Sequence, residues 1–172
     1  MTRRYPDGLY PERWLMTDER LGDDLWRILR HLPPGSGVVF RHYRLPPADR
    51  RAMFARVRRI ARARRLVLFA VDPPLPGAAG RHGRVAGATS WPAHDRAEAL
   101  AGKRAGAALL FVSPLYTTAS HPGTPALGPR KARRIAAGLN LPVVALGGMT
   151  PRRYRRLRTA GFAGWAAIDA WR

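Results

Sequence analysis

The sequence SPLYTTASHPGTPALG (residues 113–128) follows one short apolar run, and PVVALGG (residues 142–148) contains a second. A third apolar run, LVLFAV (residues 66–71), does not alternate between apolar and polar residues, which is typical of a strand that is buried on both faces of a parallel sheet. We predict strands over residues 108–112 and 143–146 and a helix over residues 129–139 between them. The order strand, loop, helix, strand indicates an α/β fold built from βα units.

The same alternation continues on both sides of this region. Further strands are predicted near residues 15, 39, 68 and 166. Helices are predicted over residues 21–32, 49–65 and 93–105, and a last one after Thr150, which is expected to act as its N-cap with Pro151 in the first turn. Repeated βα units of this kind are typical of a parallel sheet closed into a barrel.

The segment PPLPGAAGRHGRVAG, residues 73–87, breaks this alternation. It contains too many glycines and prolines for the interior of a helix, so only strand remnants near residues 81 and 87 are predicted. We therefore predict a TIM (βα)8-type barrel that is shortened, with one or two helices missing around residues 73–87. A length of 172 residues is consistent with one barrel domain, residues 1–172.

The composition restricts the classes of function. Apolar residues make up 46% of the chain and charged residues 24%, a balance that is typical of a globular protein. The absence of cysteine excludes disulfides, thiolate metal sites and cysteine nucleophiles. The sequence lacks the apolar stretch of a signal peptide, and no apolar run approaches the length of about 18 residues that a membrane span needs. We therefore expect a cytoplasmic protein with no membrane partner.

The formal net charge of +20 raises the alternative of a basic nucleic-acid-associated protein, because basic surfaces bind phosphate backbones. Only Lys103 and Lys131 among the 31 basic residues are lysines, and coding bias in a GC-rich genome produces such an arginine excess without any functional demand. The arginine-rich faces at residues 50–65 and 152–158 contain few aromatic side chains for base stacking. We therefore expect nucleic acid to bind only non-specifically, and this alternative stays open.

The candidate functional residues follow the predicted strands. In parallel barrels the chemistry lies in the loops that leave the C-terminal ends of the strands, and Arg41, Asp72, Ser113 and Gly147 each occupy such a position. The hydroxyl groups and free amides of the 113–128 loop suit a phosphate. Loops also contain the same residue types because these residues form turns, and the residues alone favour this second interpretation.

Two motifs together resemble the thiamine phosphate synthase family. FVSPLYTTASHPG (111–123) is similar to the family's strand ending in Ser-Pro, with a Thr-x-(Thr/Ser)-(Lys/His) turn after it. LPVVALGGMTP (141–151) is similar to its proline-led strand, double glycine and helix-starting threonine. The resemblance implies a transferase that joins hydroxymethylpyrimidine diphosphate to a thiazole phosphate. Its products are thiamine phosphate and diphosphate, and its partners are these small phosphorylated substrates.

The resemblance also implies which residues act in this reaction. The catalytic residues that it implies are Arg41, which grips the diphosphate, and the turn residues Thr118, Ser120 and His121. The substrate-binding residues that it implies are Thr89 at the exit of the fifth strand and Gly147 and Gly148 at the thiazole phosphate. Asp72 matches a carboxylate that holds Mg²⁺, which is the expected cofactor.

Several positions depart from the family pattern. Tyr43 stands where the family has a lysine, and the stretch His-x-Gly-Gln-x-Asp is reduced to Arg81-His82-Gly83, so a second magnesium carboxylate has no counterpart. Asp169 adds a negative charge beside the expected phosphate loop of the last strand. Each well-placed group that is lost commonly lowers the rate roughly 10²- to 10³-fold. These departures favour, as an alternative, a TenI-type thiazole tautomerase or a thiamine phosphate-binding relative without turnover.

Overall fold

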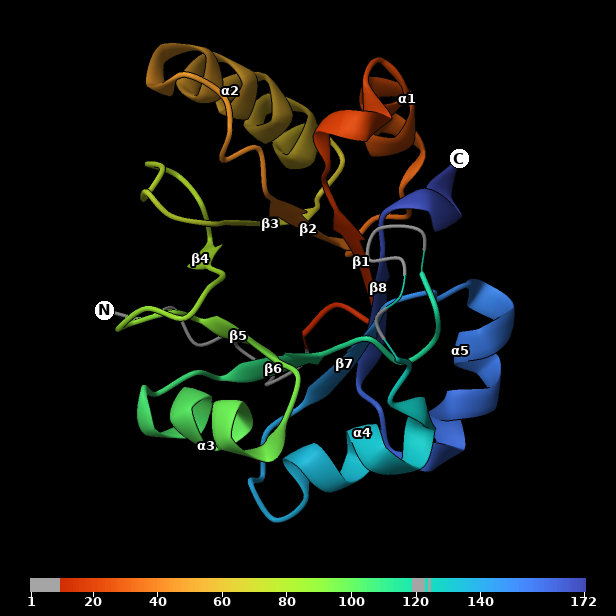
Figure 1. Cartoon of the computed structure of the whole chain (residues 1–172). Coiled ribbons are helices and arrows are strands. Elements are labelled where there is room, and N and C mark those ends of the chain that lie inside the picture. The colour runs from red at the N-terminus through yellow and green to blue at the C-terminus, as the bar shows by residue number, and fades with distance from the viewer. Residues whose placement is uncertain (1–9, 119–122, 124) are drawn as a thin grey trace.

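The computed structural model describes residues 10–118, 123 and 125–172 and contains one eight-stranded parallel sheet that curves into a barrel (Figure 1). Its strand order is β4-β3-β2-β1-β8-β7-β6-β5. The strands are β1 (Arg13–Met16), β2 (Gly37–Phe40), β3 (Val67–Ala70), β4 (Gly80–Arg81), β5 (Ser90–Ala93), β6 (Leu109–Val112), β7 (Val143–Leu146) and β8 (Gly164–Ala167). The prediction of a TIM-type barrel is therefore confirmed.

The barrel closes between its two edge strands, β4 and β5. In the described part of the chain these strands are joined by an isolated parallel bridge between His82 and Ser90 rather than by a full ladder. The His82 amide donates to the Ala70 carbonyl, and the Gly83 amide donates to the Ser90 carbonyl at 3.1 Å. The closure therefore depends on few hydrogen bonds, because β4 is only two residues long.

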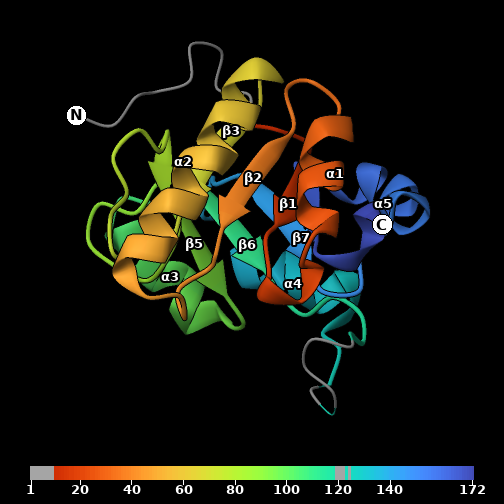
Figure 2. The same cartoon turned by 90° about the horizontal axis from the view of Figure 1, so that it is seen from above.

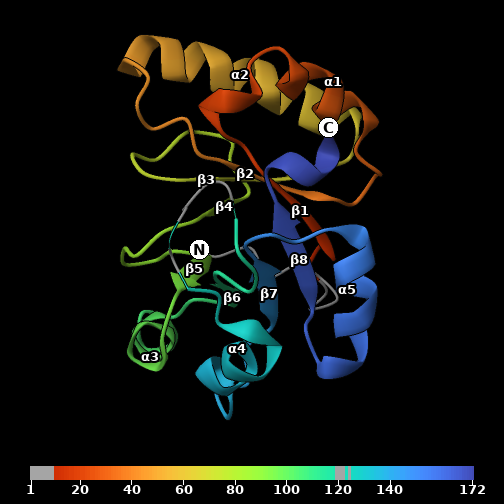
Figure 3. The same ribbon diagram turned by 45° about the vertical axis from the view of Figure 1, so that its right-hand side comes forward.

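The helices cover the outside of the barrel in two groups. They are α1 (Asp24–His31), α2 (Pro47–Ala63), α3 (Arg96–Arg104), α4 (Gly128–Ala136) and α5 (Pro151–Leu157), with short 3-10 helices η1 (Glu19–Leu21), η2 (Arg158–Ala160) and η3 (Asp169–Trp171). Helices α1 and α2 lie together over β1, β2 and β3, and α3, α4 and α5 lie on the other side (Figures 1, 2 and 3). None of the described helices combines the length and the apolar character that crossing a membrane requires.

No helix is present between β3 and β5, all of whose connecting residues are described. This confirms that helices are missing around residues 73–87, and the physical reason is the high content of glycine and proline in this segment. The position of β5 differs from the prediction, which placed a strand remnant near residue 87 and a helix from residue 93. The strand begins at Ser90 and contains Pro92, which is tolerated because β5 is an edge strand.

Aromatic rings fill the interior of the barrel. The ring of Trp14 on β1 lies 5.0 Å from that of Phe69 on β3 and 5.3 Å from that of Phe111 on β6, between ring centroids. All three side chains are fully buried. A Cβ atom at Gly37 would overlap the Trp14 ring, and one at Gly80 would lie 2.6 Å from Phe69, so these glycines make room for the rings. The barrel is therefore a packed core, and any ligand must bind at its ends.

Candidate active site

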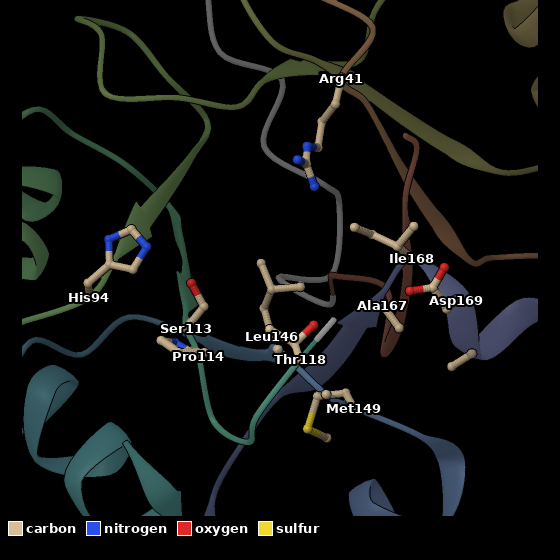
Figure 4. Close-up of a pocket in the computed structure, with 13 residues that line it drawn as sticks. Arg41, His94, Ser113, Pro114, Thr118, Leu146, Met149, Ala167, Ile168 and Asp169 are labelled. Atoms are coloured by element: carbon tan, nitrogen blue, oxygen red, sulfur yellow. The ribbon is translucent and has the colours of Figure 1, made fainter. Parts of the chain in front are cut away.

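A cavity of about 150 Å³ opens at the C-terminal ends of the strands. Residues that directly follow five different strands line it: Arg41 after β2, His94 after β5, Ser113 after β6, Gly147 after β7 and Ile168 after β8. Arg41 reaches into the cavity from one side, and Thr118 and Met149 lie on the opposite side (Figure 4). The cavity therefore lies where the loops of a parallel barrel bring residues together that are distant in sequence.

One side of the cavity is made by two loops that pack tightly against each other. The amide of Leu115 donates to the Leu146 carbonyl at 2.9 Å, and that of Tyr116 donates to the Gly147 carbonyl at 3.1 Å. Gly147 and Gly148 have φ angles of 95° and 60°, which are in the left-handed region that favours glycine. These two glycines are therefore needed for the turn itself, whatever they bind.

The contact between these loops also explains why neither glycine has room for a side chain. A Cβ atom at Gly147 would lie 2.7 Å from the Cα atom of Pro114, and one at Gly148 would lie 2.5 Å from the Thr117 carbonyl oxygen. The guanidinium group of Arg153 donates to the Gly148 carbonyl and lies over the Tyr116 ring, 4.5 Å from its centroid. The two motifs recognised in the sequence thus form one packed unit.

Two backbone amides of this unit, those of Gly148 and Met149, donate no hydrogen bond to a residue in the described part of the chain. Both residues line the cavity, as does Thr118. Adjacent main-chain N–H groups beside a glycine turn are a common way to bind phosphate oxygens, because no side chain keeps the anion away. This side of the cavity therefore suits a phosphate group.

The opposite side of the cavity carries the positive charge of Arg41. Its amide donates to Thr17 Oγ1 at 2.9 Å, and its Nη2 lies 3.8 Å from Asp18 Oδ2. Burial raises the pKa of Asp18, but hydrogen bonds from Arg20 and the charges of Arg20 and Arg41 outweigh it, so that the net pKa is lowered. Asp18 is therefore ionised near neutral pH, and it holds the Arg41 side chain, which is 21% exposed, at the edge of the cavity.

Two polar residues on the cavity wall were not assigned a role by the family motifs. His94 Nδ1 lies 2.8 Å from Arg84 Nη2 and 2.9 Å from Glu98 Oε2. The position of His94 directly after β5 could have identified it from the sequence. The prediction missed it because it placed this strand near residue 87 instead of at Ser90–Ala93. Asp169 lies on the wall beside β8, with Arg172 Nη1 4.0 Å from its Oδ1 atom. The added anion expected near the last strand is thus on the cavity wall.

The structure brings some of the expected site residues together and separates others. Arg41, Thr118, Gly147 and Gly148 line the cavity. Ser120 and His121 lie outside the described residues.

Thr89 is not at a strand exit, so this expectation was wrong. It lies directly before β5 and is buried, and its hydroxyl accepts a hydrogen bond from the Arg81 amide at 3.3 Å. The physical reason is that the strand occupies residues 90–93, which places His94 at the exit instead.

Asp72 lies at the exit of β3 but is paired with another side chain. Arg81 Nη2 lies 2.8 Å from Asp72 Oδ1 and 3.1 Å from Oδ2, and Arg81 Nε lies 3.2 Å from Oδ1. The described residues contain no group of three or more histidines, aspartates or glutamates that could hold a metal ion. The residues that the structure describes therefore do not fit the magnesium site that the family resemblance implies.

Comparisons with known proteins agree with these features. A family model described as thiamine monophosphate synthase matches residues 86–171, half of the chain. The chain is 35% identical to a thiamine biosynthesis bifunctional protein of Symbiobacterium thermophilum, in a match that covers 77% of this chain. It is 40% identical over 80 residues, 45% of its length, to a thiamine-phosphate synthase of Geobacillus kaustophilus.

These curated relatives are longer than the region that matches them. The matched regions cover 32% of the first relative and 36% of the second, so the chain spans about a third of their lengths. Among solved structures, the thiamine phosphate pyrophosphorylase of Pyrococcus furiosus superposes with a TM-score of 0.80 over 95% of this chain and 88% of that protein, at 19% identity. This superposition supports the barrel fold.

Proposed function

The chain belongs to the thiamine monophosphate synthase family, and we propose that it is a transferase that joins hydroxymethylpyrimidine diphosphate to a thiazole phosphate. The products are thiamine phosphate and diphosphate. In this proposal residues 1–172 form one barrel domain that works in the cytoplasm. The observation that carries the proposal is the cavity with Arg41 on one side and, on the other, the amides of Gly148 and Met149, which have no acceptor among the described residues.

The two sides of the cavity suit the two phosphorylated substrates. The amides beside the glycine turn would bind the thiazole phosphate, with the Thr118 hydroxyl close to them. Arg41 would bind the diphosphate, because a guanidinium group forms strong paired hydrogen bonds with phosphate oxygens. This arrangement would hold the thiazole ring between the phosphate turn and the pyrimidine.

The reaction needs electrostatic stabilisation more than proton transfer. The bond between the pyrimidine methylene carbon and the diphosphate oxygen breaks, and its electron pair leaves with the diphosphate. The thiazole ring nitrogen then supplies the electron pair of the new C–N bond. Arg41 would act by stabilising the negative charge that develops on the diphosphate, a contribution that is commonly worth roughly 10²- to 10³-fold in rate. The described residues do not fit a magnesium site, so the proposed reaction relies on the chain's own side chains and amides.

A second candidate is a relative that binds thiamine phosphate or a thiazole phosphate but does not join the two substrates. Two observations favour it. The carboxylate of Asp72 is held by Arg81, and Asp169 places a negative charge on the cavity wall, where it would repel a second phosphorylated group. A TenI-type tautomerase is one form that this candidate takes.

Thiamine phosphate formation from both substrates by the purified protein tests the proposal. Arg41→Ala should lower the rate at least roughly tenfold. Arg44→Ala is the matched control, because Arg44 is an exposed arginine of the same loop and does not line the cavity. Equal rates in the two variants would contradict the role of Arg41. If no product forms although calorimetry detects binding of thiazole phosphate, the second candidate holds.

A further inference from the structure

The ion pair of Arg81 and Asp72 is bidentate and lies at the same end of the barrel as the candidate active site. Asp72 follows β3, and Arg81 ends β4. Both carboxylate oxygens accept hydrogen bonds from the guanidinium group, and the two side chains are 36% and 35% exposed. Paired hydrogen bonds of this kind are among the stronger polar contacts in proteins. Arg81 and Asp72 therefore form a well-defined ion pair at this edge of the barrel.

The register of β3 and β4 brings the two side chains together. The two strands are parallel neighbours and Ala70 pairs with Arg81, so the end of β4 lies beside the loop that leaves β3. The Arg81 side chain is held further by its Nη1, which donates to the Ala86 carbonyl at 3.3 Å. The Arg81 amide donates to Thr89 Oγ1. Backbone and side chain thus both fix Arg81 next to Asp72.

A second guanidinium group fixes the loop on both sides of Asp72. Arg50 of α2 is only 3% exposed, and it donates to the Val71 carbonyl at 2.6 Å and to the Pro73 carbonyl at 2.9 Å. It also donates to the His42 carbonyl at 3.0 Å. Two permanent positive charges therefore lie close to the one carboxylate of this loop.

This environment is unfavourable for a divalent cation. Mg²⁺ binds through carboxylate oxygens and keeps a shell of water in near-octahedral geometry. At Asp72 it would have to displace the Arg81 guanidinium group and would then lie beside the positive charges of Arg81 and Arg50. Repulsion between such charges at a few ångströms is considerable even at the high dielectric of a protein surface.

We propose that Arg81 takes the place of a metal ion at Asp72, so that this protein carries a built-in cation where the family resemblance implies Mg²⁺. Its carboxylate is neutralised by a side chain of the same chain, and the protein itself binds no divalent cation there. The part of the inference that concerns the reaction rests on the proposed function, whereas the part that concerns metal binding does not.

Binding of Mn²⁺, followed by the loss of its free-ion electron paramagnetic resonance signal, tests the inference without substrates. The wild-type protein should show no saturable site that depends on Asp72. Arg81→Ala should gain a site at least about tenfold tighter than any wild-type binding, because a full positive charge is removed beside the carboxylate. The double variant Arg81→Ala with Asp72→Asn should lose this site. Arg84→Ala is the control, since Arg84 pairs with Glu98 instead.

Three results would overturn the inference. The first is saturable Mn²⁺ binding by the wild type that Asp72→Asn abolishes. The second is the absence of any gain in Arg81→Ala, and Arg81→Gln gives the same test with a side chain that keeps more of the original shape. The third is an equal gain in Arg84→Ala, which would show a general effect of charge.

The assay of the proposed function and the test of metal binding can fail independently of each other. If no thiamine phosphate forms while the Mn²⁺ results are as expected, the proposed function fails and the inference stands. If thiamine phosphate forms and EDTA leaves its rate unchanged, both are supported. If the wild type binds Mn²⁺ through Asp72 and product formation requires added Mg²⁺, the function is supported and the inference is wrong.

Discussion

The Nδ1 atom of His82 lies 2.9 Å from the hydroxyl oxygen of Ser90, and this pair joins the two edge strands of the barrel. His82 is buried, with its ring 4.9 Å from that of Phe111 between centroids. Ser90 is fully buried. The junction of β4 and β5, which has few backbone hydrogen bonds, is therefore closed by a polar contact inside an aromatic core.

The burial of His82 predicts acid sensitivity. Desolvation, with a smaller effect of the Arg41 charge, lowers its pKa from 6.5 to about 3. The unfolded chain therefore binds a proton at this residue between about pH 6.5 and pH 3, where the folded protein does not, and the free energy of unfolding falls as the pH falls through this window. The slope for one such group approaches about 1.4 kcal/mol per pH unit.

Urea denaturation of the wild type and of His82→Asn at several pH values between 7.5 and 4 measures this slope. Asparagine can still hydrogen-bond to Ser90 but does not titrate, so the variant should lose stability less steeply on acidification. A residual slope is expected from His42, because burial also lowers its pKa. Identical slopes in both proteins would contradict the prediction.

Gly147→Ala should lower stability by about 2–5 kcal/mol. The new Cβ atom would meet the backbone of Pro114 at 2.7 Å, and the φ angle of 95° is unfavourable for alanine. Gly106→Ala is the control, because Gly106 has a φ angle of 78° but no atom within 4 Å of the added Cβ, so only about 1 kcal/mol should be lost there. Thermal unfolding of both variants measures the difference. Equal losses of stability in Gly147→Ala and Gly106→Ala would show that the contact between Gly147 and Pro114 does not contribute to stability.

Arg50→Ala should destabilise the protein by about 3 kcal/mol or more, since it leaves the carbonyl groups of His42, Val71 and Pro73 without their charged donor. Arg50→Lys should recover only part of this loss, because an ammonium group cannot reach the three acceptors in the same way. Arg51→Ala, at the neighbouring exposed position, should change the free energy of unfolding by less than about 0.5 kcal/mol. Chemical denaturation measures all three.

Thr150→Ala should cost about 1 kcal/mol, because the Thr150 hydroxyl accepts the hydrogen bond from the Arg153 amide that caps α5. Thr150→Ser keeps the hydroxyl and should be close to the wild type. If the serine variant is as unstable as the alanine variant, the loss arises from the threonine methyl group and not from the cap.

Several features were correctly predicted because they depend on local sequence. The strand over Val143–Leu146 was placed at its observed bounds, and Thr150 was identified as an N-cap. Apolar runs and capping residues act over a few positions, so a single sequence reveals them. The segment at residues 73–87 was predicted to lack a helix for the same reason, since the effect of glycine and proline on helix stability is local.

Other features required the tertiary structure. The exit of β5 was misplaced, so Thr89 was expected in the site and His94 was not. Strand β5 contains a proline and is recognised only by its pairing with β6, which is a contact between distant residues. The pairing of Asp72 with Arg81 likewise follows from the register of β3 and β4, which no local pattern reveals.

By itself, the sequence determined the alternation of elements, the barrel class, the loss of helices near residue 80 and the family to which the chain belongs. Only the tertiary structure decided which charged side chains meet. It places Arg41 on the wall of a cavity that Gly148 also lines, and it places Arg81 on Asp72. The physical reason is that secondary structure depends mainly on neighbours in the chain, whereas the charge of a site depends on which strand ends the closed barrel brings together.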